Sequence, residues 1–323
     1  MPQSKPVVVV TRKLPDAIET RMMELFDARL NLSDAPMSKA QLIEAIAEAD
    51  VLTPTVTDRI DAEVIRAAGA NLKLIANFGT GVDHIDLAAA KAKGMVVTNT
   101  PDVLTEEVAD TALGLLIMAV RELGAAERYL RAGRWAGEGD YPLTGGTLRG
   151  KTVGVLGLGR IGKAIAQRLE AFGLSIVYHG RSRQDGVDYA YYPDLAEMAG
   201  AVDILMSVAP GGAETRHIIN ADVLKALGPE GWVINIGRGS VVDEAALADA
   251  LRTGTIAGAG LDVFENEPNV PAELMAFDNV VLLPHVGSAS LHTRQLMGQL
   301  VVDNLRRWFD TKEALTPVAE CRP

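Results

Sequence analysis

Three segments of the sequence place polar side chains of catalytic type directly after short apolar runs. Arg238 ends the segment INIGR, Glu267 ends LDVFENE and His285 ends LLPH. Each run is typical of a buried parallel strand, and ligands of open parallel sheets bind beyond the carboxyl ends of the strands. We therefore expect these three side chains to face one crevice.

Together these residue types suit the reduction of a keto acid. The planar guanidinium of Arg238 stays charged and can clamp a carboxylate and a carbonyl oxygen. A carbonyl carbon that accepts hydride leaves an alkoxide, and the imidazole of His285 can protonate it near neutral pH. Glu267 would orient that imidazole and favour its charged form. The other histidines are expected to be structural, because none of them stands at such a strand end: His84, His179, His217 and His292.

A glycine-rich turn supplies the second element of this chemistry. The sequence GLGRIG follows an apolar run at 152–156 and precedes a helical pattern at 163–172. Strand, glycines and helix occur in the order of a dinucleotide-binding unit, in which the helix N-terminus faces a pyrophosphate. An ordinary glycine-rich turn is the alternative. We expect a cofactor to bind at Gly157, Gly159, Arg160, Ile161 and Gly162.

The next predicted strand, at 175–178, indicates which dinucleotide this is. An NAD site usually has an acidic residue after that strand, but Gly180 stands here, followed by Arg181, Ser182 and Arg183. Two guanidinium groups and a hydroxyl could hold a 2′-phosphate through charge-assisted hydrogen bonds. The pattern favours NADP(H) as the cofactor, with NAD(H) possible and no metal. The alternative is that the same residues form an ordinary solvated surface turn.

A second loop with two glycines lies in the first half of the chain. Gly79, Thr80 and Gly81 follow the apolar run at 72–76 and lack a third glycine at the dinucleotide spacing. Their N–H groups could hold a small carboxylate, although an ordinary turn is equally compatible with the pattern.

The elements that must position these residues alternate between β-branched runs and amphipathic stretches, which predicts an α/β protein with parallel strands. Ten such runs are too many for one ordinary sheet, so we expect two doubly wound sheets. A long helix at 106–130 and a loop at 133–150 would separate them. A last helix at 291–309 would return to the first domain.

Composition excludes several classes of protein. The 323 residues include 42 acidic and 31 basic side chains, for a net charge of -11, which disfavours nucleic acid and anionic membranes as partners. The apolar stretch at 112–120 is too short to span a bilayer. Cys321 is the one cysteine, which suits a reducing, cytoplasmic location and no Cys-rich metal site.

The motifs GLGRIG, NIGRGSVVDE, GLDVFENEP and LLPHVGSAS occur in this order. With them the chain resembles the D-isomer-specific 2-hydroxyacid dehydrogenases, most closely the glyoxylate/hydroxypyruvate reductases. The resemblance implies Arg238 as the substrate-binding arginine, Glu267 as the partner of the catalytic histidine, and His285 as the acid/base. It also implies substrate contacts from Val56, Gly79, Thr80, Gly81 and Ser288, and a cofactor contact from Asp262.

The resemblance further implies a Rossmann NAD(P)-binding domain at 102–289, inserted into a flavodoxin-like substrate domain formed by 1–101 and 290–323. It implies a homodimer in which Trp135 reaches the partner's active site. The function expected is NADPH-dependent reduction of glyoxylate or hydroxypyruvate to glycolate or D-glycerate. A dehydrogenase for a bulkier substrate, of the D-lactate or phenylpyruvate type, and a dinucleotide-sensing binding protein are the alternatives.

Overall fold

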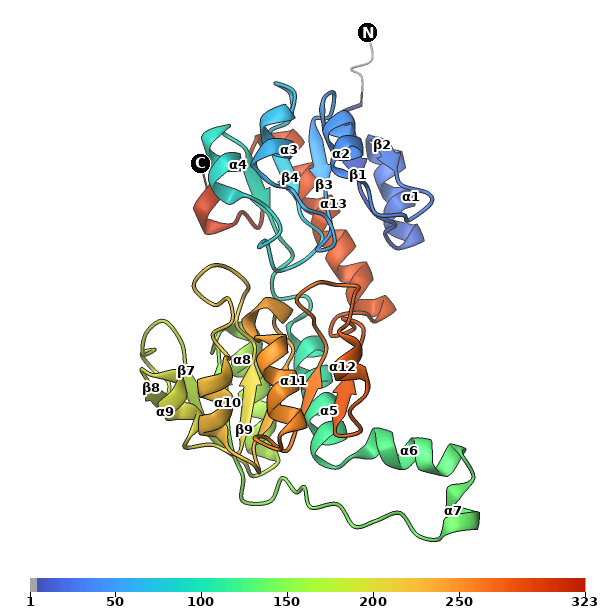
Figure 1. Cartoon of the computed structure of the whole chain (residues 1–323). Coiled ribbons are helices and arrows are strands. Elements are labelled where there is room, and N and C mark those ends of the chain that lie inside the picture. The colour runs from blue at the N-terminus through green and yellow to red at the C-terminus, as the bar shows by residue number, and fades with distance from the viewer. Residues whose placement is uncertain (1–4, 323) are drawn as a thin grey trace. The chain divides into compact units, whose positions relative to one another are not determined.

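The computed structural model describes residues 5–322 and divides into two compact units, each an α/β layer structure (Figure 1). The first unit runs to Leu104 and resumes at Ala289, and the second is Thr105–Ser288. The boundaries expected from the sequence, after 101 and after 289, lie within a few residues of these. Both sheets are entirely parallel, so the predicted fold class is confirmed.

The first unit has five parallel strands in the order β2-β1-β3-β4-β5, which is the flavodoxin-like order. As predicted, the last helix returns to this unit, where α13 packs on α1. The elements are β1 Val7–Val10, α1 Asp16–Leu25, β2 Asp27–Leu30, α2 Lys39–Ile46, β3 Val51–Thr53, α3 Ala62–Ala67, β4 Leu74–Ala76, α4 Leu87–Ala92, β5 Val96–Thr98 and α13 Leu291–Thr311.

The second unit has seven parallel strands in the order β12-β11-β10-β9-β6-β7-β8. The strand order reverses between β6 and β9, which is where doubly wound sheets bind ligands. The elements are α5 Thr105–Val120, α6 Leu123–Arg131, α7 Arg134–Glu138, β6 Thr152–Leu156, α8 Arg160–Ala171, β7 Ser175–His179, β8 Ala190–Tyr192, α9 Leu195–Ala199, β9 Ile204–Ser207, α10 Ala221–Leu227, β10 Trp232–Asn235, α11 Glu244–Arg252, β11 Gly258–Leu261, α12 Ala272–Met275 and β12 Val280–Leu282.

The core of the second unit explains why its central strands are apolar on both faces. Every residue of β9 and β10 is buried. On one face, α9, α10 and α11 contribute apolar side chains such as Leu224 and Leu247 to a single cluster. On the other face α5 packs so closely that a Cβ at Gly260 would lie 2.9 Å from Leu115. Helices on both faces require nearly continuous apolar strands, as observed.

Two strands were missed by the sequence analysis. β2 has the sequence DARL, and β8 has the sequence AYY. Both lie at the edge of a sheet, where one side faces solvent and the apolar signal weakens. Neither strand contains a fully buried residue.

The predicted single helix at 106–130 is wrong. The chain breaks between α5 and α6 at Glu122, which has a left-handed φ of 52°. Gly124, a weak helix former, lies two residues further on, in the first turn of α6. Only Tyr129 of α6 is buried, so the second half lacks a core-facing stripe. In Figure 1, α6 and α7 extend away from the sheet of the second unit.

Two findings bear on the expectations from composition. Among the helices of residues 5–322, none combines the length and the apolar character that crossing a bilayer requires. Cys321 is a buried free thiol.

The packing of α13 on α1 gives a stability prediction. Gly298 of α13 lies so close to α1 that a Cβ there would be 2.5 Å from Cγ1 of Ile18. Overpacking of this kind costs about 1–3 kcal/mol, which outweighs the better helix propensity of alanine. We expect Gly298→Ala to lower the free energy of unfolding, measured by urea denaturation followed by circular dichroism.

Gly114→Ala is the matched control, because Gly114 is exposed on α5 and a Cβ there would meet no atom within 4 Å. This variant should gain about 0.5–1 kcal/mol. A Gly298→Ala protein as stable as the parent would contradict the packing assigned to α13.

Candidate active site

The three predicted catalytic residues follow neighbouring strands at the carboxyl edge of the second unit's sheet. Arg238 follows β10, Glu267 follows β11 and His285 follows β12. Nδ1 of His285 lies 2.7 Å from Oε2 of Glu267, and each side chain is 28% exposed. The charge of Arg238 also acts on Glu267. The structure therefore brings the three groups together with the imidazole accessible.

The state of Glu267 determines where the protons of this pair lie. Burial is the largest influence and raises the pKa of Glu267, but the hydrogen bond and charge of His285, the Phe264 N–H and the charge of Arg238 outweigh it. The net pKa lies below the ordinary value, so the carboxylate is ionised at neutral pH and only accepts hydrogen bonds. Nδ1 of His285 must then carry a hydrogen, which leaves Nε2 for chemistry.

Asp262 fixes the loop that carries His285. Its carboxylate oxygens accept hydrogen bonds from the N–H groups of Val286 at 2.7 Å and Gly287 at 2.9 Å, and its carbonyl accepts the N–H of His285. These bonds hold His285 at a left-handed φ of 54°. Asp262 is 1% exposed, and burial raises its pKa. Its direct contacts are with this loop, and a cofactor contact stays a prediction.

The turn that carries Glu267 is held from two further sides. Oε1 of Glu267 accepts the N–H of Phe264 at 2.9 Å, and Glu244 of α11 accepts the N–H of Glu265 at 2.8 Å. Gly239 is in backbone contact with this turn, since a Cβ there would lie 1.8 Å from the carbonyl carbon of Phe264. No side chain larger than hydrogen fits at that position. The segments of Arg238 and Glu267 thus form one packed unit.

Arg238 sits on a turn shaped by the last residue of β10. The buried amide of Asn235 donates to the Arg238 carbonyl at 2.9 Å and accepts the Gly237 N–H at 3.2 Å. One guanidinium nitrogen donates to the Gly237 carbonyl at 2.8 Å. A guanidinium carries five N–H donors in a planar fork, and this geometry suits a carboxylate as a partner.

The glycine turn between β6 and α8 has the geometry of a phosphate-binding loop. Gly157 has a φ of 97°, and a Cβ there would lie 3.0 Å from the backbone nitrogen of Ala209, just after β9. Around Gly159 a Cβ would meet no atom within 4 Å, so the backbone is open to a ligand. No side chain of the N-cap residue Gly159 caps α8, and an uncapped helix N-terminus is a suitable site for a phosphate. These residues fit a dinucleotide.

Residues of the predicted 2′-phosphate site follow β7 and are exposed. The side chains of Arg181, Ser182 and Arg183 make no hydrogen bond or ion pair within residues 5–322. The turn therefore presents two guanidinium groups without a protein counter-charge, as a phosphate site requires.

In the first unit, the predicted carboxylate loop follows β4 and is organised by a residue that the sequence analysis did not single out. Asn77 is fully buried, and its amide donates to the carbonyls of Gly79 and Gly81, each at 2.9 Å. Among the described residues, the N–H groups of Gly79, Thr80 and Gly81 have no acceptor. The side chain of Val56 borders the loop, since a Cβ at Gly79 would lie 3.0 Å from it.

Within residues 5–322, neither Trp135 nor Ser288 makes a hydrogen bond or ion pair with Arg238, Glu267 or His285. Trp135 lies on α7, is 59% exposed and donates to Asp140 at 3.1 Å. Ser288 follows Gly287 in the loop of His285. Their predicted substrate roles stay predictions.

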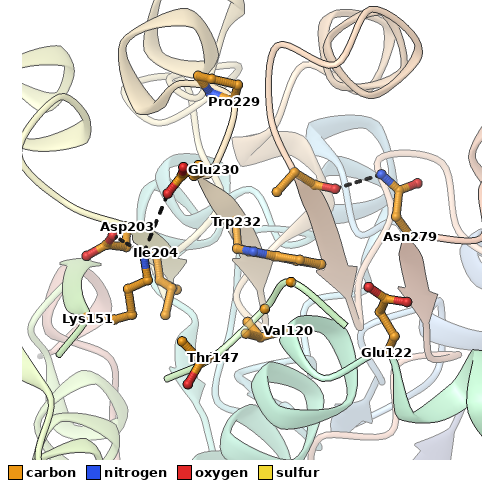
Figure 2. Close-up of a pocket in the computed structure, with 13 residues that line it drawn as sticks. Val120, Glu122, Thr147, Lys151, Asp203, Ile204, Pro229, Glu230, Trp232 and Asn279 are labelled. Atoms are coloured by element: carbon orange, nitrogen blue, oxygen red, sulfur yellow. Dashed lines mark hydrogen bonds and ion pairs between the residues drawn. The ribbon is translucent and has the colours of Figure 1, made fainter. Parts of the chain in front are cut away.

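A cavity of about 380 Å³ lies at the amino edge of the second unit's sheet, opposite the edge that carries Arg238, Glu267 and His285. Figure 2 shows Lys151 pointing to Asp203 and Glu230, with nitrogen to oxygen distances of 2.7 and 3.9 Å, beside Trp232. None of the predicted site residues lines this cavity. Within residues 5–322, no group of three His, Cys, Asp or Glu side chains could hold a metal ion.

Comparisons with known proteins agree with this geometry. The family model of the D-isomer specific 2-hydroxyacid dehydrogenase NAD binding domain matches residues 113–287. The chain belongs to the D-isomer-specific 2-hydroxyacid dehydrogenase family, and the residues that match the NAD binding domain lie within the second unit.

Individual relatives have reductase names. A glyoxylate/hydroxypyruvate reductase of Arabidopsis thaliana is 51% identical over 248 residues, covering 77% of this chain and 79% of the plant protein. A hydroxyphenylpyruvate reductase of Plectranthus scutellarioides is 50% identical over 258 residues, covering 80% and 82%. The crystal structure of an NADPH-dependent glyoxylate/hydroxypyruvate reductase from Sinorhizobium meliloti, in complex with NADP and malonate, is 52% identical with a TM-score of 0.93 and covers 98% of each chain.

The pKa directions of two neighbouring glutamates predict opposite pH dependences. Because the pKa of Glu267 is lowered in the native state, ionisation of this group stabilises the protein above the unfolded pKa of about 4.3. That contribution is lost as pH falls through the native pKa. We expect Glu267→Gln to be about 1–2 kcal/mol less stable than the parent at pH 7, with the gap closing between about pH 5 and pH 3.

Glu244→Gln is the matched control, for which the expected pH dependence of stability has the opposite sign. Burial, aided by the charges of Glu265 and Glu267, raises the pKa of Glu244, so its stabilising contribution is lost as pH rises through the native pKa. This variant should gain stability relative to the parent as pH increases from about 3 to 7. Urea unfolding at each pH measures both, and parallel pH profiles for the two variants would contradict the assigned environments.

Proposed function

We propose that the protein is an NADPH-preferring reductase of small 2-keto acids, converting glyoxylate or hydroxypyruvate to glycolate or D-glycerate. The observation that carries this proposal is the 2.7 Å contact between His285 and Glu267 at the sheet edge that also carries Arg238 and the glycine turn. An oriented proton donor beside a dinucleotide loop suits carbonyl reduction. The names of the Arabidopsis and Sinorhizobium relatives support the substrate class.

When bound, NADPH supplies the hydride that the C2 carbonyl accepts. His285 provides the matching proton from Nε2 to the carbonyl oxygen, and its ring becomes neutral. Glu267 holds Nδ1–H throughout, so the ring keeps its orientation as its charge changes. Arg238 pairs with the substrate carboxylate and polarises the carbonyl.

Several further roles belong to the proposal. We assign Gly157, Gly159, Arg160, Ile161 and Gly162 to the pyrophosphate and Asp262 to the nicotinamide end. Val56, Gly79, Thr80, Gly81 and Ser288 are assigned to the substrate, with the open N–H groups of the loop as support.

A homodimer and a cytoplasmic location complete the proposal. The segment after α5 exposes apolar side chains, with Leu130 at 56% and Trp135 at 59% exposure, as expected of a surface that a second copy covers. The location rests on the composition and the single cysteine, Cys321.

A bulkier 2-keto acid is the second candidate substrate, because the Plectranthus relative carries the name hydroxyphenylpyruvate reductase at 50% identity. A dinucleotide-sensing binding protein has less support, since such a protein would not need Arg238, Glu267 and His285 in one cluster.

Replacement of His285 tests the proton donor. His285→Ala should lower kcat for glyoxylate or hydroxypyruvate by about 10²- to 10⁴-fold, because the alkoxide loses its acid. The NADPH dissociation constant should stay within about twofold, since His285 contacts the reacting oxygen and not the dinucleotide phosphates. The control is His292→Ala on the exposed face of α13. Unchanged turnover in His285→Ala would remove this residue from the mechanism.

A second prediction concerns cofactor preference. Arg181→Ala combined with Arg183→Ala removes two charge-assisted hydrogen bonds to the 2′-phosphate and should raise the NADPH dissociation constant about 10²-fold. NADH lacks that phosphate, so its dissociation constant should change little. Fluorescence titration with both dinucleotides measures the effect, and Arg149→Ala, an exposed arginine of the same unit, is the control. Equal weakening of NADPH and NADH would refute the assigned 2′-phosphate site.

A further inference from the structure

The turn that carries Arg181 and Arg183 is anchored by the residue that follows it, Gln184. The side-chain amide of Gln184 donates to the carbonyl of Leu158 at 2.7 Å, and its backbone N–H donates to the hydroxyl of Tyr178 at 2.8 Å. Leu158 is a residue of the glycine turn, and Tyr178 is a buried residue of β7. One residue thus ties the arginine turn to the glycine turn and to the sheet.

The other end of the turn is held as well. The hydroxyl of Tyr191 on β8 donates to the carbonyl of Gly180 at 3.2 Å. The ring centroids of Tyr191 and Tyr178 lie 5.2 Å apart, so the two residues whose hydroxyls hold the turn also pack against each other. Between Gly180 and Gln184 the three side chains are exposed and make no bond of their own in the described chain. The backbone of the turn is fixed while its cationic groups stay available.

A dinucleotide with a 2′-phosphate would contact both of these turns. The pyrophosphate would lie on the glycine turn and the 2′-phosphate on the arginine turn, and the Gln184 amide joins these two turns. If the arginine turn were free, binding would have to order it, which weakens affinity. Only a ligand that uses the arginine side chains would lose affinity in this way.

We propose that Gln184 is a positioning residue that sets the discrimination between NADPH and NADH by holding the arginine turn against the glycine turn. The inference rests on the proposed NADPH preference and deepens it. Gln184 acts through Arg181 and Arg183 and makes no contact with the phosphate itself. A residue that only closed the loop would affect both dinucleotides alike.

The test uses Gln184→Ala in the full chain, titrated with NADPH and with NADH by fluorescence in the absence of a keto acid. Loss of one neutral hydrogen bond should raise the NADPH dissociation constant about threefold to tenfold. The NADH dissociation constant should stay within about twofold. The control is Gln167→Ala, the same change at an exposed position of α8, which should alter neither constant.

Tyr178→Phe provides a second, independent variant. It keeps the ring contact with Tyr191 and removes the hydroxyl that accepts the Gln184 N–H. We expect a selective loss of NADPH affinity in the same direction, and this variant decides the question if Gln184→Ala does not fold. Adenosine 2′,5′-bisphosphate and 5′-AMP serve as fragment probes, and only the bisphosphate should bind more weakly to either variant.

The outcomes separate this inference from the proposed function. Equal weakening of NADPH and NADH, or no change in either, would overturn the role of Gln184 while leaving the reductase proposal intact. A parent protein that binds NADH as tightly as NADPH would overturn the cofactor preference, and with it this inference, before any variant is compared. A selective loss for NADPH in Gln184→Ala supports both.

Discussion

The hydrogen bond between Nδ1 of His285 and the carboxylate of Glu267 is the interaction on which the rest of the site depends. Its two partners come from different turns, and each turn is fixed by its own backbone bonds. Asp262 holds the loop of His285, and the Phe264 N–H orients Glu267. Because both partners are preorganised, the imidazole can change charge without changing orientation, which is the requirement of an acid that must protonate a developing alkoxide.

The parallel sheet makes this assembly possible. Residues far apart in the sequence follow β10, β11 and β12, and a parallel arrangement brings all three ends to one edge. The same edge carries the glycine turn after β6. A Cβ would lie 2.6 Å from the backbone of Ala209, which follows β9, at Gly237 and 3.0 Å from it at Gly157, so a side chain would clash at Gly237 and be crowded at Gly157. The glycine turn and the pair of His285 and Glu267 are therefore parts of one packed layer. The cavity at the amino edge is lined by none of these groups.

The sequence was informative where chemistry and local pattern coincide. The apolar run at 152–156, the glycine turn after it and the strand-end residues Arg238 and His285 all carry a local signal, and in the structure they form a strand, a turn and strand ends as expected. The edge strands β2 and β8 lack a continuous apolar pattern, and the break at Glu122 follows from the absence of a buried stripe in α6. Asn77, Glu244 and Gln184 were missed for another reason. Each acts through a side chain that reaches a backbone group of a neighbouring turn, and only the folded chain shows which group that is.

The central claim is that this sheet edge couples hydride acceptance by a 2-keto acid to proton donation by His285. The most direct measurement follows NADPH absorbance with the purified protein and a panel of glyoxylate, hydroxypyruvate and phenylpyruvate, with identification of the product. We expect keto-acid-dependent oxidation of NADPH and formation of one 2-hydroxy acid for each NADPH consumed. NADPH binding without oxidation by any member of the panel would contradict the claim and indicate a dinucleotide-binding protein without reductase activity.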